Sequence, residues 1–367
     1  MDKHNVGTIA ILRECKNKWE RRCSITPTEV AVLVQNGIKV IVQPSTTRCF
    51  TEDEFVSAGA VIQEDVTEAN VIFGVKEVPI ENLLANKTYF FFSHTIKAQA
   101  YNMPLLDRLL ELNIRMVDFE CIRTKPSADK MPERLVAFGR YAGIAGAFDF
   151  LRGIGEYLLE KKYQTPFVFL GSTYMYQDYE AMCQALQMVT KNIERAGLPK
   201  ALSPIVIGVT GTGRCASGSL EVLEQLPHVK VEPKDLKKFL SENKGMNKKI
   251  VISQFTSKDV AVKTDGGAFE KAEYYKHPEH FVGCFEDYLD CVHFLVNDIY
   301  WEEKYPRLIT MEGLKKKVEA GKSVFMGVTD ISADECGSIE FTSRFTSIEE
   351  PYLLYNPVSK TFKEKIS

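Results

Sequence analysis

Short apolar runs alternate with amphipathic segments along the first third of the chain. Strand-length apolar runs occur at residues 8–12, 40–42, 71–74, 89–92 and 115–118. Such runs are typical of parallel strands that are covered on both faces, and the helical patterns between them can supply the covering layers. The pattern therefore predicts an open α/β domain built on a parallel sheet.

The helix that follows the first predicted strand carries a complete start signal. Thr26 can serve as the N-cap, Pro27 as the first helical residue, and Glu29 completes a capping box. Gly37 ends the apolar stripe of this helix. The local sequence therefore predicts a helix that starts at residue 27.

A second alternation of elements follows two long helical patterns. The helix predicted over residues 138–160 is rich in glycine and alanine, which allow close packing and suit a connector between domains. The other predicted elements are a strand at 167–170, a helix at 175–196, and strands at 205–209, 229–231, 249–252, 292–296 and 324–329. Residues 341–367 show no clear element.

The two alternations predict an α/β protein with two Rossmann-like, doubly wound domains and a cleft between them. Residues 1–139 form the expected substrate-binding domain, which residues 331–367 are expected to rejoin. Residues 140–330 form the expected dinucleotide-binding domain with its connecting helices.

Composition narrows the classes of function. The chain has 367 residues, of which 45% are hydrophobic and 26% charged, and its net charge of −3 gives no basic footprint for nucleic acid. No apolar run reaches the length of a membrane span. Only residues 1–7 precede the first predicted strand, too few for a targeting peptide, which favours a cytoplasmic location.

The pattern of cysteines and histidines argues against a metal site. The chain has nine cysteines, an odd number, and no pair is spaced as CxxC, so we expect reduced thiols. His277 and His280 share a polar loop but lack further ligands at metal spacing.

A glycine-rich turn follows the apolar strand at 205–209. Gly211, Gly213 and Ala216 fit the pattern G-x-G-x-x-A, which permits a tight turn, close approach of a pyrophosphate, and close packing of helix on strand. The alternative is an ordinary glycine-rich loop between a strand and a helix. The context of strand and helix favours a dinucleotide site.

The choice between NAD and NADP stays open at this stage. Glu232 stands 19 residues after Gly213, near the distance at which an acid binds the ribose in NAD enzymes. Nearby Lys234, Lys237 and Lys238 could instead accept the 2′-phosphate of NADP.

Two polar segments end neighbouring strands of the first domain. Lys76 and Glu77 follow one strand, and His94 follows the next. Open α/β sheets build their sites at strand ends, where a lysine and a histidine can share proton transfers. Glu77 and Glu120 could tune them. Taken alone, each of these side chains is more often solvated or structural.

Arginines in the same domain are candidate carboxylate ligands. Arg13, Arg22 and Arg134 carry the planar guanidinium that suits a carboxylate, although a single arginine is more often part of a surface ion pair.

Several segments together resemble the lysine–ketoglutarate reductases, also called lysine-forming saccharopine dehydrogenases. They are GVKEVP (74–79), FFSHTIKAQ (91–99), VDFE (117–120), LVAFGRYAGIAG (135–146), GTGRCASG (211–218) and VTDISADECGSIEF (328–341). The resemblance spans nearly the whole chain and extends to the reductase half of the bifunctional aminoadipic semialdehyde synthases. The opening segment is also similar to alanine dehydrogenases and transhydrogenases.

The resemblance implies roles for individual residues. Lys76 matches the general base and His94 the general acid, with Glu77 and Glu120 modulating them. The matched substrate contacts are Arg13, Lys97, Gln99, Arg134 and Phe138. The matched cofactor contacts are Gly213 and Arg214 in the turn, with Asp330 and Ser332 in a later loop.

The implied reaction condenses L-lysine with 2-oxoglutarate and reduces the imine to saccharopine with NADPH or NADH. Family members extend past the position of Ser367, so a saccharopine-cleaving dehydrogenase domain is expected in a longer parent chain. The animal members imply a mitochondrial location. The alternatives are another amino-acid dehydrogenase on the same scaffold and a truncated nucleotide-binding module without catalysis.

Overall fold

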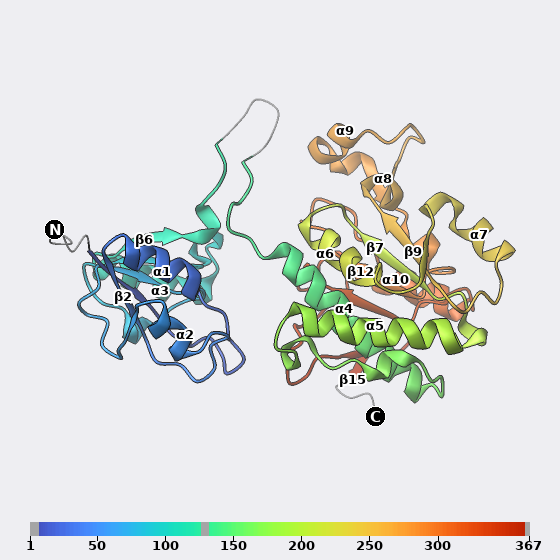
Figure 1. The fold of residues 1–367 in the computed structure, drawn as a ribbon. Helices are drawn as coiled ribbons and strands as arrows, with labels where there is room; N and C mark the ends of the chain where they lie inside the picture. Colours follow the sequence, from blue (N-terminus) through green and yellow to red (C-terminus); the bar gives the residue numbers. More distant parts are fainter. Residues whose placement is uncertain (1–6, 126–131, 364–367) are drawn as a thin grey trace. The chain divides into compact units, whose positions relative to one another are not determined.

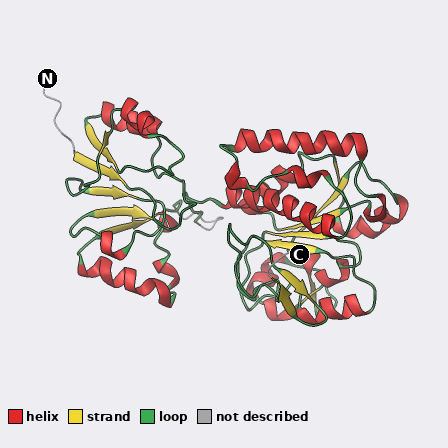
Figure 2. Ribbon diagram, turned by 90° about the horizontal axis from the view of Figure 1, so that it is seen from below, coloured by secondary structure: helices red, strands yellow, loops and turns green. Residues whose placement is uncertain are grey.

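The computed structural model describes residues 7–125 and 132–363, which form two compact units, Met1–Ala137 and Phe138–Ser367 (Figure 1). Helices cover both faces of the main sheet in each unit (Figure 2). The predicted boundary at residue 139 falls two residues from the observed one.

The first unit is built on a six-stranded parallel sheet in the order β3-β2-β1-β4-β5-β6. This order is common in doubly wound dinucleotide-binding sheets. Its strands are β1 (Gly7–Ile11), β2 (Ile38–Val42), β3 (Val61–Ile62), β4 (Val71–Phe73), β5 (Thr88–Phe91) and β6 (Arg115–Asp118). Its helices are α1 (Pro27–Gln35), α2 (Glu52–Ser57) and α3 (Met103–Glu111).

The predicted start of α1 is confirmed. Thr26 is the N-cap, Pro27 is the first helical residue, and the Glu29 side chain closes the capping box. The sheet separates two apolar clusters, one around Val30 and Phe55 and the other around Tyr89 and Phe91. Burial on both faces explains why the strands were visible as continuous apolar runs.

The second unit contains a five-stranded parallel sheet in the order β13-β12-β7-β9-β8. These strands are β7 (Val206–Thr210), β8 (His228–Lys230), β9 (Ile250–Phe255), β12 (Phe294–Asn297) and β13 (Gly327–Asp330). The helices are α4 (Gly139–Glu160), α5 (Tyr179–Ala196), α6 (Arg214–Leu223), α7 (Leu236–Glu242), α8 (Ser257–Val260), α9 (Lys271–Lys276) and α10 (Met311–Glu319). Two small antiparallel pairs join β10 (Ala261–Lys263) to β11 (Phe281–Gly283) and β14 (Leu354–Asn356) to β15 (Thr361–Lys363).

The small residues of α4 allow close helix packing, as the sequence predicts. A Cβ on Gly143 would lie 2.8 Å from the backbone nitrogen of Ser219, and one on Gly218 would lie 2.8 Å from the backbone carbon of Arg140. Helices α4 and α6 therefore touch backbone to backbone.

The predicted strand at 167–170 is wrong, because Pro166–Phe169 form a 3-10 helix. Proline lacks the N–H of a ladder residue. The fully buried Phe167 instead packs into the core that contains α4. Tertiary packing thus accounts for the apolar run without strand pairing.

The carboxyl-terminal residues differ from two expectations. They lie in the second unit and do not rejoin the first. Tyr355 stacks on Phe341, contacts the Phe362 ring at a tilt, and joins with them an apolar cluster of the second unit. Residues 354–363 contain the β14–β15 hairpin where no element was expected.

All nine cysteines are unpaired, as the sequence predicts. Among the described residues, no helix combines the length and the apolar character that crossing a membrane would require.

Candidate active site

The acid–base candidates Glu77 and His94 are in direct contact. Lys76 and Glu77 follow β4, and His94 follows its parallel neighbour β5, so both segments lie at the carboxyl edge of one sheet. One carboxylate oxygen of Glu77 lies 2.6 Å from His94 Nδ1, and the other lies 3.1 Å from Lys16 Nζ. The predicted meeting of these strand ends is therefore observed.

Glu14, which sequence reasoning missed, positions the lysine segment. Its two carboxylate oxygens accept hydrogen bonds from the backbone N–H groups of Val75 at 2.7 Å and Lys76 at 2.8 Å. Burial raises the pKa of Glu14, partly offset by these two hydrogen bonds. An acid three residues past β1, the strand that pairs with β4, was the available signal.

The backbone of His94 has an uncommon conformation that neighbouring residues hold in place. Its φ is 55°, in the left-handed region. Asp118, at the end of β6, accepts hydrogen bonds from the backbone and the hydroxyl of Ser93, and the Phe92 ring stacks on the imidazole. Strain kept at such a position is typical of functional sites.

The charges around this site shift two pKa values downward. Burial and then the nearby Arg22 charge lower the pKa of Lys76, against the opposing pull of Glu77 and Glu20. Burial alone would raise the pKa of Glu77, but hydrogen bonds from His94, its own backbone and Lys16 outweigh burial and lower it to about 2. The site thus combines an anionic Glu77 with a lysine that loses its proton more easily than usual.

The two candidate arginines beside β1 face different surroundings. Arg13 forms a two-pronged ion pair with Glu64, at 2.5 and 2.8 Å, and also contacts the carbonyl of Pro44. Glu64 and Pro44 follow β3 and β2, whereas Lys76 and His94 follow β4 and β5 on the other side of β1.

Arg22 pairs with Glu20 at 2.6 and 2.8 Å, and its charge reaches Lys76. The arrangement therefore favours Arg22 over Arg13 as the arginine nearest the acid–base candidates. A cavity of about 300 Å³ lies beside this part of the site, and Arg13, Lys76 and Glu77 are among the residues that line it.

Glu120 and Arg134 are also brought together. Their ion pair measures 2.7 Å, and the Glu120 side chain is only 4% exposed. The second carboxylate oxygen of Glu120 is buried without a hydrogen-bond donor among the described residues. Gln99 is exposed on the loop after His94, while the side chain of Lys97 lies outside the described part of the structure. Phe138 caps α4 and belongs to the second unit.

The glycine-rich turn has the geometry expected of a pyrophosphate cradle. Gly211 has φ of +92°, which favours glycine, and a Cβ on Gly213 would meet nothing within 4 Å. Gly213 is the N-cap of α6, and the exposed Arg214 is the first helical residue. Open space over the backbone at a helix start fits a dinucleotide phosphate.

The sheet order corrects the premise on which Glu232 was chosen. That choice assumed that the strand after the glycine-rich turn and its helix pairs with the turn's own strand, as in the common order. Here β9 pairs with β7, and β8 is the edge strand. Glu232, which follows β8, therefore lies two strand spacings from β7, roughly 10 Å.

Asp330 and Ser332 meet at the end of β13, but their polar atoms face the protein. Asp330 accepts hydrogen bonds from Asn297 at 2.8 Å, Ser332 at 2.7 Å and Thr342 at 3.0 Å. These contacts give Asp330 a role in ordering the loop. The half-buried Asp298 in the same region was missed; burial raises its pKa.

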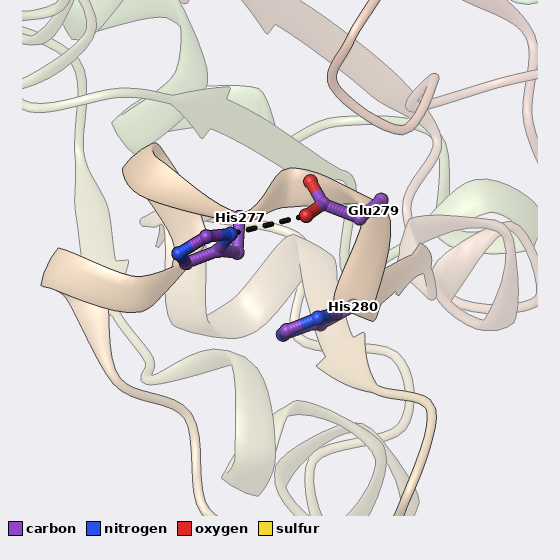
Figure 3. A group of neighbouring side chains, drawn as sticks. All are labelled: His277, Glu279 and His280. Atoms are coloured by element: carbon purple, nitrogen blue, oxygen red, sulfur yellow. Dashed lines mark hydrogen bonds and ion pairs between the residues drawn. The ribbon is translucent and has the colours of Figure 1, made fainter.

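His277, Glu279 and His280 group together in a manner that could hold a metal ion (Figure 3). Their ligand atoms lie within 4.8 Å of one another. However, His277 already contacts Glu279 at 3.1 Å, and His280 contacts Glu273 at 3.1 Å, which also pairs with Lys263. These contacts explain the group without an ion, and the expectation that no metal is bound stays a prediction.

The first unit matches a known domain family. Residues 10–145 match the family described as alanine dehydrogenase/PNT, N-terminal domain. Among solved structures, an L-alanine dehydrogenase has a TM-score of 0.56 at 16% identity, with 96% of this chain and 80% of that chain covered. This similarity shows the fold.

Longer similarities connect both units to one group of proteins. The chain is 38% identical over 370 residues to the alpha-aminoadipic semialdehyde synthase, mitochondrial, of Bos taurus, covering 96% of this chain and 39% of that protein. The Arabidopsis thaliana protein of the same kind is 36% identical over 373 residues, with 97% and 34% covered. A saccharopine dehydrogenase (NAD(+), L-lysine-forming) of Neurospora crassa is 26% identical over 348 residues, with 93% and 76% covered.

The chain thus spans well under half the length of the semialdehyde synthases that it matches. Residues 10–145 are thus similar to the alanine dehydrogenase/PNT N-terminal domain family, and the chain is similar over nearly its whole length to one part of the alpha-aminoadipic semialdehyde synthases.

Proposed function

We propose that this chain is a nicotinamide-dinucleotide oxidoreductase that condenses L-lysine with 2-oxoglutarate and reduces the product to saccharopine. The observation that carries the proposal is the contact between Glu77 and His94 beside Lys76, whose pKa is lowered. It supplies the acid and base that imine formation requires. The similarity to semialdehyde synthases and lysine-forming dehydrogenases supports the choice of substrates.

Lys76 acts first as the proton acceptor. It takes a proton from the ε-ammonium of the substrate lysine, and the freed amine attacks the 2-oxo carbon to give a carbinolamine. His94 then donates a proton to the hydroxyl, which leaves as water, and a protonated imine remains. The ionised Glu77 holds the protonated imidazole in place through its 2.6 Å contact.

Substrate carboxylates are held by arginines in this proposal. Each of the three candidate arginines already pairs with a carboxylate, Arg22 with Glu20, Arg134 with Glu120 and Arg13 with Glu64. Arg22 and Arg134 are the preferred ligands, because the charge of Arg22 acts on Lys76 and Arg134 holds the candidate Glu120. The unpartnered oxygen of Glu120 can accept a hydrogen bond from a substrate ammonium group. Such positioning is worth several kcal/mol, up to roughly 7–11.

The second unit binds the dinucleotide through the turn at Gly211 and Gly213 and the start of α6, with Arg214 beside the phosphates. The bound dinucleotide supplies the hydride that reduces the imine carbon. NADPH is the proposed form, with NADH as the alternative.

A direct test is oxidation of NADPH or NADH that requires both lysine and 2-oxoglutarate, with saccharopine identified by mass spectrometry. We expect turnover only when both substrates are present. Oxidation with another oxo acid and ammonia would indicate a different amino-acid dehydrogenase, and dinucleotide binding without turnover would indicate a non-catalytic module.

Two further assignments depend on the longer relatives. A mitochondrial location is proposed because the name of the cattle relative carries that designation. A saccharopine-cleaving dehydrogenase is the proposed partner, in the same parent chain or separate. Organelle fractionation and a coupled assay test these assignments.

A further inference from the structure

The order of the second sheet changes which residues face the adenosine end of a bound dinucleotide. In a doubly wound sheet the ribose is read at the end of the strand beside the glycine-rich strand. In this chain β7 lies between β12 and β9, and β9 is the neighbour on the side of β8, the strand that follows the glycine-rich turn and its helix. It pairs with β7 along its length, from Val206 opposite Val251 to Thr210 opposite Phe255. The residues that follow Phe255 therefore occupy the place where the ribose is read.

Two hydrogen bonds tie this end of β9 to the glycine-rich turn. The backbone N–H of Gly211 donates to the carbonyl of Phe255 at 2.8 Å, and the Gln254 side chain donates to the carbonyl of Gly211 at 2.8 Å. The end of β9 is thus fixed directly against the pyrophosphate turn.

The segment after β9 offers a positive charge and lacks an available acid. Thr256, Ser257 and Lys258 follow Phe255, and Lys258 is exposed. None of the ion pairs described for the chain uses Lys258. The next acid along the chain, Asp259, accepts hydrogen bonds from the backbone and hydroxyl of Thr256 at 2.9 and 2.7 Å, so it caps its own helix.

These features suit a phosphate better than a free ribose diol. Enzymes that prefer NAD place a carboxylate where it accepts a hydrogen bond from the ribose 2′-hydroxyl, and NADP enzymes place a cation there. A lysine ammonium is a common phosphate ligand that acts as a point charge. Glu232 and Lys234 follow the edge strand β8, with β9 between them and β7.

We propose that Lys258 is the specificity-determining residue of the dinucleotide site, binding the 2′-phosphate of NADPH, and that Glu232 does not contact the ribose. The inference rests on the proposed use of a nicotinamide dinucleotide. It replaces the residue chosen by sequence spacing with one chosen by strand order.

Isothermal titration of the full chain with NADPH, NADH, adenosine 2′,5′-bisphosphate and AMP tests the proposal without turnover. The wild type should bind NADPH at least about tenfold more tightly than NADH, and the bisphosphate more tightly than AMP. Lys258→Met should remove most of this preference, because it weakens the binding of NADPH and leaves the affinity for NADH unchanged. Lys258→Arg should keep the preference.

Matched variants on the edge strand provide the control. Lys234→Met and Glu232→Gln should leave all four affinities within about twofold of wild type, a difference of under about 0.5 kcal/mol. Equal affinity of the wild type for NADPH and NADH would overturn the inference. So would an unchanged preference in Lys258→Met, or a loss of NADH affinity of fivefold or more in Glu232→Gln.

The saccharopine assay separates failure of this inference from failure of the proposed function. Saccharopine formation with equal affinity for both dinucleotides would refute the role of Lys258 and leave the reaction intact. A 2′-phosphate preference that depends on Lys258, without saccharopine formation, would support the subsite and refute the reaction.

Discussion

The two parallel sheets of this chain are built from similar sequence patterns but pair their strands differently. In the first, β2 follows β1 in the sequence and lies beside it; in the second, β8 follows β7 but β9 lies between them. Local sequence specifies that a strand, a turn and a helix follow one another. Strand order depends on which apolar surfaces pack together across the whole unit, and any rule that counts residues from a motif inherits this dependence.

The proposed function gives proton transfer to the first unit and dinucleotide binding to the second, and the test with the largest expected effect separates the two roles. Lys76→Met and His94→Asn should each lower kcat/KM about 10²–10⁴-fold, because acid–base groups contribute that much. Asparagine suits the left-handed backbone at residue 94 better than alanine does. Steady-state kinetics measures the loss.

Dinucleotide affinity in these two variants should stay within about threefold of wild type, under about 0.7 kcal/mol. Lys39→Met, which removes a surface lysine that pairs with Glu68, serves as the matched control. A parallel loss of dinucleotide affinity would contradict the division of roles between the units.

The stability of the second unit should be sensitive to a larger side chain at Gly143, where α4 contacts α6. Gly143→Ala places a methyl group against the backbone of Cys215 and Ser219, which cannot rotate away, so it should destabilise the unit by about 1–3 kcal/mol. Urea unfolding followed by circular dichroism measures this cost. Ala142→Ser, at an exposed neighbour, should change stability by less than about 0.5 kcal/mol.

The stability of the first unit should depend more strongly on acidic pH than that of the second, because Glu77 is ionised in the folded chain. The pKa of Glu77 is lowered to about 2 in the folded chain, from an ordinary value of 4.5. Its ion contacts therefore stabilise the fold fully above about pH 5, and this stability is lost as the pH falls through 4.5 toward 2.

The free energy of unfolding of the wild type should exceed that of Glu77→Gln by about 1–2 kcal/mol at pH 7. This value is reduced to allow for partial screening by solvent. The gap should narrow steadily below about pH 4.5 and close only as the pH approaches 2. Urea titrations at pH 7, 5, 4 and 3 measure the gap, and a difference that stayed constant over this range would rule out the ionised Glu77 as its source.

The smallest effect distinguishes the two arginines beside β1. Arg22→Ala should raise the KM for 2-oxoglutarate about tenfold, and Arg13→Ala should change it less than about threefold, with stability altered by under about 1 kcal/mol. The reason is that the charge of Arg22 acts on Lys76, whereas Arg13 pairs with an exposed Glu64. A larger effect at Arg13 would reverse their roles.

Particular residues show which features of the candidate site could be predicted from the sequence. The meeting of Glu77 with His94 could be predicted because parallel neighbours end at one edge. The turn at Gly211 could be predicted because its backbone demands are local. Glu14 was missed because its carboxylate serves backbone N–H groups 61 and 62 residues away, a contact that no local pattern encodes.

The close seating of α4 on α6 has a mechanical consequence. Helix α4 begins two residues after the last residue of the first unit, and a Cβ on Gly139, its first residue, would come within 3.4 Å of the Arg214 side chain at the phosphate turn. With no compressible side chain at Gly143 or Gly218 to absorb a displacement, the first turns of α4 are seated directly on α6 and its start. A displacement of the start of α4 should therefore also shift the turn that is proposed to hold the phosphates.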